Sequence, residues 1–460
     1  MAFSRRTRTR RGGGLGIVAA LLFLTALLFA LAAFYAIPLG LGDKKAVDLF
    51  GWLVERRVAY QSGFALAAVN LVVAALAPAL RGDTGRGWLR TLFAAANAAL
   101  LVLLVVRSDA ILAQRDEVSA DSRPFTDMPG TVYDDPVRAA ELIRTGTAVQ
   151  ATAVRDRLVR RVFGADGLPT AKVFDIQDRD IREPRLDDVG AARIDRFSLA
   201  LPHGYGAVAY HMVPAAPNGR LMLYNHGHVG SLFSDQAREA IRRFLAAGYA
   251  VTAFSMPHRE PNLTPKVLDL PLHGSIAVPE RHDHETFQWL ETAEFSPIRL
   301  FIEPLIVAVT QGLMDGYTGI AASGLSGGGW TVTVAAALDT RIAASYPVAG
   351  SLPVHLALLP PNSPQDWEQR GADIYRIATY LDLYVLGAAG PGRRQVQILN
   401  QFDACCFRGV GARGYGPAVA AAAERLGGHY RLEILPEHAH HISPEAYDII
   451  LGDLEKAFTP

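Results

Sequence analysis

The chain begins with apolar stretches long enough to cross a bilayer. Residues 12–42 contain no charged side chain and include the apolar run 15–39. About 20 apolar residues, rising 1.5 Å each, cover the hydrocarbon core, so 15–39 predicts a transmembrane helix. Two further uncharged stretches, 58–80 and 91–106, predict a second and a third span, the third needing its flanking arginines to reach the interfaces.

Positive charge gives the expected orientation of these spans. Eight arginines precede the first span or separate the second from the third, whereas four basic residues lie in the first loop. This bias places the N-terminus in the cytoplasm and, with three spans, the rest of the chain on the outer side. If 91–106 does not span, the orientation inverts. A cleaved signal peptide is the alternative for the first stretch, and buried soluble helices for the other two.

The pattern then changes to one typical of a helix-covered sheet. Residues 108–165 are polar and predict a connector between a membrane segment, 1–107, and a folded domain, 166–460, with a short helix at 135–143. Beyond the connector, β-rich runs alternate with helix-length patterns, which predicts an α/β fold with a mostly parallel central sheet. The predicted strands are 171–176, 193–201, 207–213, 220–225, 250–254, 319–322, 343–348, 395–399 and 430–434, and the helices are 234–247, 298–314, 328–338 and 444–458. Two insertions, 257–313 and 352–393, are expected to form caps over a site.

Composition narrows the functional classes. Lys+Arg and Asp+Glu number 45 each, so the formal charge is zero and no basic field exists to hold nucleic acid. Half of the residues are hydrophobic, which excludes a disordered chain and, with the predicted spans, indicates contact with membrane lipid. Cys405 and Cys406 are adjacent, so we expect neither a disulfide framework nor a cysteine zinc site. Buried free thiols are the default, and a vicinal disulfide is the lesser alternative.

The pentapeptide Gly324-Leu325-Ser326-Gly327-Gly328 is the strongest chemical signal in the sequence. As a bare pattern it is weak, but it lies between a predicted strand and a predicted helix. A serine on such a tight turn has a strained backbone and small neighbours, and its hydroxyl stands clear of the sheet near a helix N-terminus that favours negative charge. The alternative is a glycine-rich turn with an incidental serine.

A serine hydroxyl needs a base, and the base needs an orienting carboxylate. Asp403 follows the strand predicted at 395–399 and is the best-placed acid. Three histidines, His438, His440 and His441, follow the last predicted strand, and we expect one of them to be the base. A metal site at the histidine cluster is the alternative, although no cysteine or spaced acid accompanies it.

Two further segments bear on the predicted site. The backbone N–H of Gly327 is the expected first oxyanion donor, and the loop 224–230 is placed to supply the second through the backbone of His228. We expect the side chains of His226 and His228 to hold that loop rather than to transfer protons. The cluster 282–285, His-Asp-His-Glu, lines a pocket, binds a cation or forms a solvated helix start. The core is the expected location of the insertion aromatics Trp289, Trp367, Tyr375 and Tyr380.

Together these residues resemble the α/β-hydrolase superfamily over 171–460, and the architecture looks closest to acetyl-ester hydrolases and prolyl-oligopeptidase-like hydrolases. The string Ala-His-His-Ile-Ser-Pro-Glu at 439–445 is similar to the Gly-His-x-Ile-Ser-Pro-Glu segment of many esterases, which favours His440 over His441 and His438. The resemblance implies a catalytic triad of Ser326 as nucleophile, His440 as base and Asp403 as orienting acid. It further implies hydrolysis of a small-molecule or acylated substrate through an acyl-enzyme, with no cofactor or metal.

Three functions are compatible with this pattern. The first is a multi-pass membrane serine esterase whose catalytic domain lies on the non-cytoplasmic side. The second is a serine peptidase of the prolyl-oligopeptidase type, which the lack of a propeller-like repeat before the catalytic region disfavours. The third is a catalytically silent, membrane-anchored binding protein. Its sign would be a missing triad residue, and the sequence contains all three.

Overall fold

The computed structural model describes residues 46–49, 52–55, 62, 65–70, 95–100, 102, 136–270, 274–278, 284–358, 362, 365–403 and 405–458. The chain divides into two units, 1–120 and 121–460. In the first unit, β1 (Ala46–Leu49) and β2 (Trp52–Glu55) form an antiparallel hairpin. The predicted span 15–39 lies outside the described residues, and of the spans 58–80 and 91–106 only the helical residues 62, 65–70, 95–100 and 102 are described. No helix within the described ranges combines the length and apolar character needed to cross a bilayer.

The second unit is built on a nine-stranded sheet with the order β13-β12-β11-β10-β6-β7-β5-β4-β3. The strands from β13 to β7 in this order run parallel to one another. The remaining pairs, β7–β5, β5–β4 and β4–β3, are antiparallel. This is an α/β fold with a large, mostly parallel sheet. Its strands are β3 (Ile176–Asp178), β4 (Arg193–Ala200), β5 (Gly206–Val213), β6 (Arg220–Asn225), β7 (Ala250–Phe254), β10 (Gly319–Leu325), β11 (Ala344–Val348), β12 (Arg394–Asn400) and β13 (His429–Leu435).

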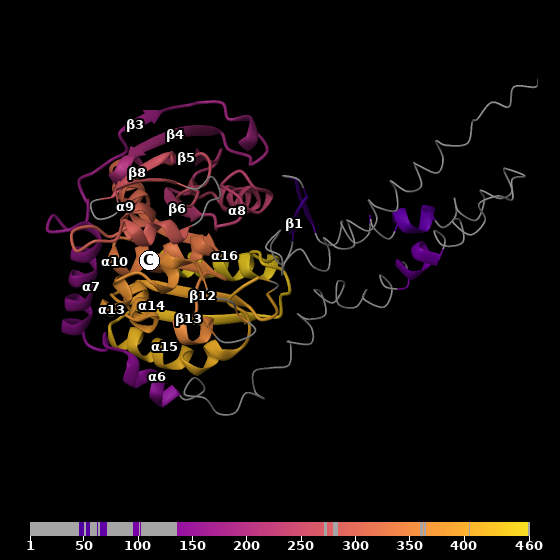
Figure 1. The fold of residues 1–460 in the computed structure, drawn as a ribbon. Coiled ribbons are helices and arrows are strands. Elements are labelled where there is room, and N and C mark those ends of the chain that lie inside the picture. The colour runs from indigo at the N-terminus through magenta and orange to yellow at the C-terminus, as the bar shows by residue number, and fades with distance from the viewer. Residues whose placement is uncertain are drawn as a thin grey trace, which may run out of the picture. The chain divides into compact units, whose positions relative to one another are not determined.

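Helices cover both faces of this sheet because its central strands are apolar on both sides. In β6, Leu221 and Leu223 belong to one hydrophobic cluster, and Met222 and Tyr224 belong to the other. The second cluster is closed by α8 (Asp235–Ala246) and α16 (Pro444–Phe458). The first is closed by α7 (Ala148–Phe163), α9 (Ile298–Met314), α10 (Gly327–Leu338), α14 (Tyr380–Ala388) and α15 (Gly416–Arg425), as Figure 1 shows. Shorter helices are α6 (Pro136–Leu142), α11 (Val354–Ala357), α12 (Trp367–Arg370) and α13 (Ile374–Ile377).

The strand register brings the segments after five parallel strands to the same edge of the sheet. Leu325 of β10 is aligned with Val348 of β11, Val348 with Ile398 of β12, and Ile398 with Glu433 of β13. On the other side of β10, Gly324 is aligned with Asn225 of β6. The segments that follow these strands therefore emerge side by side, and they carry most of the residues predicted to be functional.

Eight of the nine predicted strands are present, with ends that shift by at most three residues. The strand predicted at 171–176 is wrong, because only Ile176 of that range belongs to a strand, β3. The hairpin of β8 (Val267–Leu270) and β9 (Gly274–Ala277) and the helices α14 and α15 were not predicted.

Helix α7 lies within the segment 108–165 that the sequence predicts as a connector. Thr147 caps its N-terminus by accepting a hydrogen bond from the Gln150 N–H. Its buried residues, Ala151, Val154, Leu158 and Val162, recur at the helical spacing. This narrow apolar stripe among charged residues is a helix signal that the overall polarity of the segment obscured.

Candidate active site

Ser326 lies at the turn between β10 and α10 in a strained backbone conformation. Its backbone angles, φ 58° and ψ −130°, fall in a region that residues other than glycine rarely adopt. Every other residue from 319 to 339 is buried, so this turn exposes the serine alone. A Cβ on Gly328 would lie 2.0 Å from the Asn225 carbonyl oxygen, so glycine is required where the helix start meets the loop after β6. These features match the strand-turn-helix context that the pentapeptide predicts.

The loop after β6 lies directly against this turn. A Cβ on Gly227 would be 2.6 Å from Ser326 Cβ, which shows how closely the loop passes the serine. The ring of His226 bonds Val229 O and Ser234 Oγ through Nε2 and Tyr224 OH through Nδ1. Burial lowers the pKa of His226 to about 4, against the opposing hydrogen bond to Val229, so the ring is neutral at pH 7. As expected from the sequence, His226 holds the loop.

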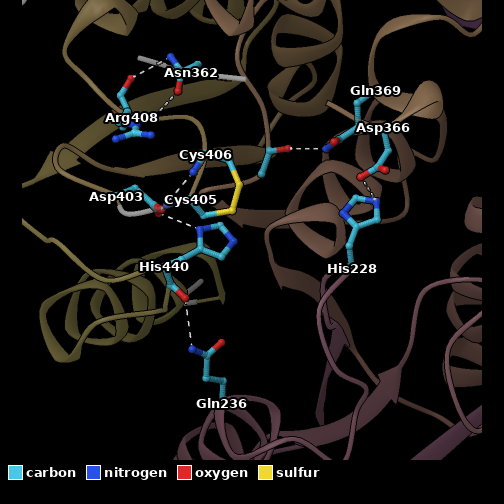
Figure 2. Close-up of a disulfide and its surroundings, with 11 residues drawn as sticks. His228, Gln236, Asn362, Asp366, Gln369, Asp403, Cys405, Cys406, Arg408 and His440 are labelled. Carbon is cyan, nitrogen blue, oxygen red and sulfur yellow. Dashed lines mark hydrogen bonds and ion pairs between the residues drawn. A yellow bond between two sulfur atoms is a disulfide. The ribbon is translucent and has the colours of Figure 1, made fainter. Parts of the chain in front are cut away.

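Asp403 and His440 form a hydrogen-bonded pair at the same edge of the sheet (Figure 2). His440 Nδ1 lies 2.8 Å from Asp403 Oδ2, and the carboxylate is fully buried. The other two candidate bases are engaged elsewhere. His441 pairs with Glu437 at 2.9 Å, and His438 stacks on Phe402 with ring centroids 4.7 Å apart. Of the three histidines, His440 is therefore the one that meets the predicted acid.

Neighbouring groups hold both members of this pair in place. The buried amide of Asn400, the last residue of β12, donates to Ala439 O and His441 O, both at 2.9 Å, and so clamps the backbone on either side of His440. The second carboxylate oxygen of Asp403 accepts the backbone N–H groups of Cys405 and Cys406 at 2.7 and 3.2 Å. Sequence reasoning did not assign Asn400 a role, although its place at the end of a strand beside Asp403 was a usable signal.

The two cysteines are bonded to each other, which corrects the expectation of buried free thiols. Cys405 and Cys406 form a vicinal disulfide with an S–S distance of 2.12 Å, drawn in Figure 2. Their sulfurs lie within 4.8 Å of a ring nitrogen of His440. A disulfide offers no thiolate, so this group of three side chains is not arranged to hold a metal ion.

The remaining nitrogen of His440 is open to a reacting group. His440 Nε2 is buried and has no hydrogen-bond partner among the described residues, and no hydrogen bond links it to Ser326 Oγ. Catalytic hydrogen bonds are often long in an enzyme without substrate and shorten in the reacting complex. An imidazole nitrogen without a hydrogen-bond partner can accept the proton of a serine hydroxyl as the hydroxyl attacks a carbonyl carbon.

A second histidine–carboxylate group lies close to Gly327, the residue that follows the serine. Glu368 of α12 is fully buried, and its Oε1 lies 2.6 Å from His228 Nε2 and 3.0 Å from His284 Nδ1. His284 is only 1% exposed, so the solvated helix start predicted for 282–285 is wrong at this residue. His282 and Asp283 lie outside the described residues. Of the insertion aromatics, Trp367, Tyr375 and Tyr380 pack into or against the core as expected, whereas Trp289 is 43% exposed.

These three side chains are close enough to be considered as metal ligands. However, both imidazole nitrogens hydrogen-bond to the same oxygen, Glu368 Oε1, so the carboxylate occupies the point where a shared ion would bind. The described geometry is therefore that of a hydrogen-bonded ion pair.

Cavity volume does not identify the site. A cavity of about 300 Å³ lies at the opposite edge of the sheet, where β10 begins, and the cavity near the end of β6 measures only about 10 Å³. The larger one is lined by Arg179, Arg193, His211, Asp315 and Tyr317 and includes no serine, threonine or cysteine. The chemistry at Ser326 carries the assignment instead.

Comparison with known proteins gives distant structural likenesses only. No family model and no curated protein matches this chain. Among solved structures, acetyl xylan esterase 1 from Thermoanaerobacterium sp. JW/SL YS485 is 13% identical, with 70% of this chain and 98% of that chain covered and a TM-score of 0.46. An acetyl xylan esterase from Paenibacillus sp. R4 has 14% identity with the same coverage and TM-score. Est1E from Butyrivibrio proteoclasticus has 15% identity, coverage of 57% and 98%, and a TM-score of 0.37. These values are too low to support an inference about function.

Proposed function

We propose that this chain is a serine esterase of the α/β-hydrolase type, with Ser326 as nucleophile, His440 as general base and Asp403 as the acid that orients it. The observation that carries the proposal is the strained φ of 58° at Ser326, on a turn whose aligned neighbouring strands lead to the Asp403–His440 pair. Backbone strain at a half-buried serine between buried neighbours is energetically costly and is typical of a functional site.

The proposed reaction follows the acyl-enzyme route. Ser326 Oγ attacks the ester carbonyl carbon while His440 Nε2 takes the hydroxyl proton, and Asp403 stabilises the imidazolium through its bond to Nδ1. The N–H of Gly327, at the first turn of α10, and the backbone of His228 bind the oxyanion. The protonated His440 then donates its proton to the leaving alkoxide. Water repeats the sequence on the acyl-enzyme and releases the carboxylic acid.

The substrate class and location belong to the same proposal. We take the substrate to be a small-molecule or acylated ester. The uncharged N-terminal stretches would anchor the enzyme in a membrane as a multi-pass protein, with the catalytic domain on the non-cytoplasmic side. A fusion of the C-terminus to a reporter that is active on only one side of the membrane tests the orientation.

Labelling with a fluorophosphonate tests the nucleophile. Full-length protein in detergent micelles should react covalently at Ser326, and Ser326→Ala should not be labelled while keeping the same melting temperature. The same preparations should hydrolyse p-nitrophenyl acetate and lose that activity on substitution. Folded wild-type protein that is neither labelled nor active, or equal labelling of Ser326→Ala, would contradict the proposal. Preference for peptide amides over esters would favour the peptidase alternative.

A further inference from the structure

The buried group formed by His228, His284 and Glu368 is held together by three hydrogen bonds, two to Glu368 Oε1 and one to Pro257 O. His284 bonds two acceptors, Pro257 O through Nε2 at 3.1 Å and Glu368 Oε1 through Nδ1 at 3.0 Å. Because the lowered pKa of Glu368 makes it a carboxylate, which only accepts, both ring nitrogens of His284 donate and the ring is an imidazolium. Glu368 is anionic because, although burial opposes ionisation, the charge of His284 and the hydrogen bonds from both imidazoles lower its pKa.

His228 occupies the third position in this group and reaches the predicted oxyanion site. Its Nε2–H donates to Glu368 Oε1 at 2.6 Å, which leaves Nδ1 uncommitted to the carboxylate. A Cβ on Gly327 would lie 2.3 Å from His228 Cε1 and 2.4 Å from Nδ1, so this edge of the ring lies against the residue whose N–H is the expected oxyanion donor. In Figure 2 the rings of His228 and His440 lie apart, and the nitrogen of each that is not bonded to a carboxylate is turned toward the other.

The charges around His228 favour its protonated form. Burial alone lowers the pKa of His228. The hydrogen bond to Glu368, the charge of this carboxylate, and the charge of Asp366, whose Oδ2 lies 3.4 Å from His228 Nε2, outweigh burial and raise this pKa above its usual value. Arg259 acts in the opposite direction, and the cationic His284 packs edge-on against the ring at 4.8 Å. The net effect of these facing groups is a ring able to carry a second proton, on Nδ1, near neutral pH.

We propose that the side chain of His228, and not only its backbone, stabilises the oxyanion by donating from Nδ1–H, and that Glu368 is the positioning residue that holds it. This inference rests on the proposed esterase function and adds one group to it. When Ser326 attacks, its proton goes to His440 and the electron pair of the carbonyl moves to oxygen. That oxygen accepts hydrogen bonds from the backbone N–H groups of Gly327 and His228 and from His228 Nδ1–H. His228 keeps its proton throughout, so the balance of the reaction is unchanged.

The requirement for a protonated His228 gives the proposal a pH signature. His228 must be charged to donate from Nδ1–H, so activity should fall as pH rises through its raised pKa. Replacing Glu368 by Gln keeps a hydrogen-bond acceptor of similar size but removes the negative charge that favours this protonation.

The experiment compares kcat and KM for p-nitrophenyl acetate between pH 5 and 10 in full-length wild type, Glu368→Gln, His228→Ala and the control Glu303→Gln. Glu303 is a fully buried carboxylate of α9 that pairs with Lys172 and Arg299, outside the site. In Glu368→Gln the alkaline limb should move by about one pH unit to lower pH. His228→Ala retains the backbone N–H and should lower kcat about 10²-fold with little change in KM. Glu303→Gln should keep the wild-type profile.

Each result decides one of the two proposals. If the wild type neither hydrolyses the ester nor reacts with fluorophosphonate, the esterase proposal fails. If the wild type is active and labelled at Ser326 but both Glu368→Gln and His228→Ala keep its kcat and its alkaline limb, the role of His228 is overturned. Equal shifts in Glu368→Gln and Glu303→Gln would also overturn it, because they would reflect the loss of any buried carboxylate.

Discussion

Two histidine–carboxylate pairs lie at the edge of the sheet that carries Ser326, and they differ in how the chain builds them. Asp403 and His440 come from segments that follow the adjacent parallel strands β12 and β13, so the register of the sheet itself brings them together. His228 and Glu368 are 140 residues apart, and Glu368 belongs to α12 in the second insertion. The first pair is held by the sheet, whereas the second depends on the insertions folding against the loop after β6.

The pairs also differ in how their hydrogen bonds are completed. Asp403 has both oxygens occupied, one by His440 and the other by two backbone N–H groups. Glu368 shares one oxygen between two imidazoles, and its Oε2 is buried without a hydrogen-bond partner among the described residues. The Asp403 carboxylate is therefore stabilised by hydrogen bonds to both of its oxygens, whereas the ionised form of Glu368 is stabilised mainly by the charges of its histidines.

The largest expected effect is the loss of catalytic activity when the Asp403–His440 pair is broken. His440→Ala should lower kcat for ester hydrolysis about 10⁴-fold, because the base is lost and with it the means to activate Ser326. His441→Ala is the matched control, since its ring is bonded only to Glu437 and should change kcat less than about twofold. Steady-state kinetics with p-nitrophenyl acetate measures both variants. A large loss in His441→Ala with activity retained in His440→Ala would reverse the assignment.

Of the two pairs, only the first could be predicted from the sequence. The order serine, aspartate, histidine after successive strands, and the Ile-Ser-Pro-Glu string that follows the histidines, indicated Ser326, Asp403 and His440. Apolar runs with turn residues between them defined eight strands, because buried parallel strands are apolar on both faces. The central sheet therefore followed from local pattern alone.

Glu368 could not have been predicted in the same way. It lies in Asp-Trp-Glu-Gln, a short segment typical of an exposed helix start. Its burial depends on contacts with His284 and His228, which lie 84 and 140 positions away in the sequence. Charged residues are almost never fully buried without partners, so sequence reasoning assigns such a residue to the surface by default. The disulfide was missed for a similar reason, because adjacent cysteines seldom pair.

The second largest expected effect is on stability rather than rate. Glu368→Gln should lower the free energy of unfolding by about 3 kcal/mol, because it leaves the buried His284 charge without its counter-ion. The folded-state pKa of Glu368 is lowered, so its contribution is complete above about pH 5 and is lost as pH falls further. The pKa of His228 is raised, so its contribution is present below about pH 6.5 and is lost as pH rises through the folded-state value.

The difference in melting temperature between wild type and Glu368→Gln should therefore be largest between about pH 5 and 6.5 and shrink on either side. Differential scanning calorimetry at pH 3.5, 5.5 and 9 measures it. Glu303→Gln is the control, because its partners are a lysine and an arginine rather than histidines, so its destabilisation should not decline on the alkaline side. The same alkaline decline in both variants would show that the charge of His228 does not contribute.

The smallest expected effect concerns the disulfide beside the first pair. Cys405 and Cys406 direct two N–H groups at Asp403 Oδ1, and their bond restricts the turn that presents them. Opening this bond should lengthen those hydrogen bonds, weaken the hold of Asp403 on His440 and lower kcat about threefold, since hydrogen bonds to charged groups contribute roughly 1 to 3 kcal/mol when fully lost. KM should not change, because neither cysteine is expected to contact substrate.

The chain has only two cysteines, so the double substitution Cys405→Ala/Cys406→Ala is an internal control. Dithiothreitol should lower kcat of the wild type toward that of the double variant and leave the variant unchanged. An equal response of both proteins to the reductant would show that the effect does not arise at this bond.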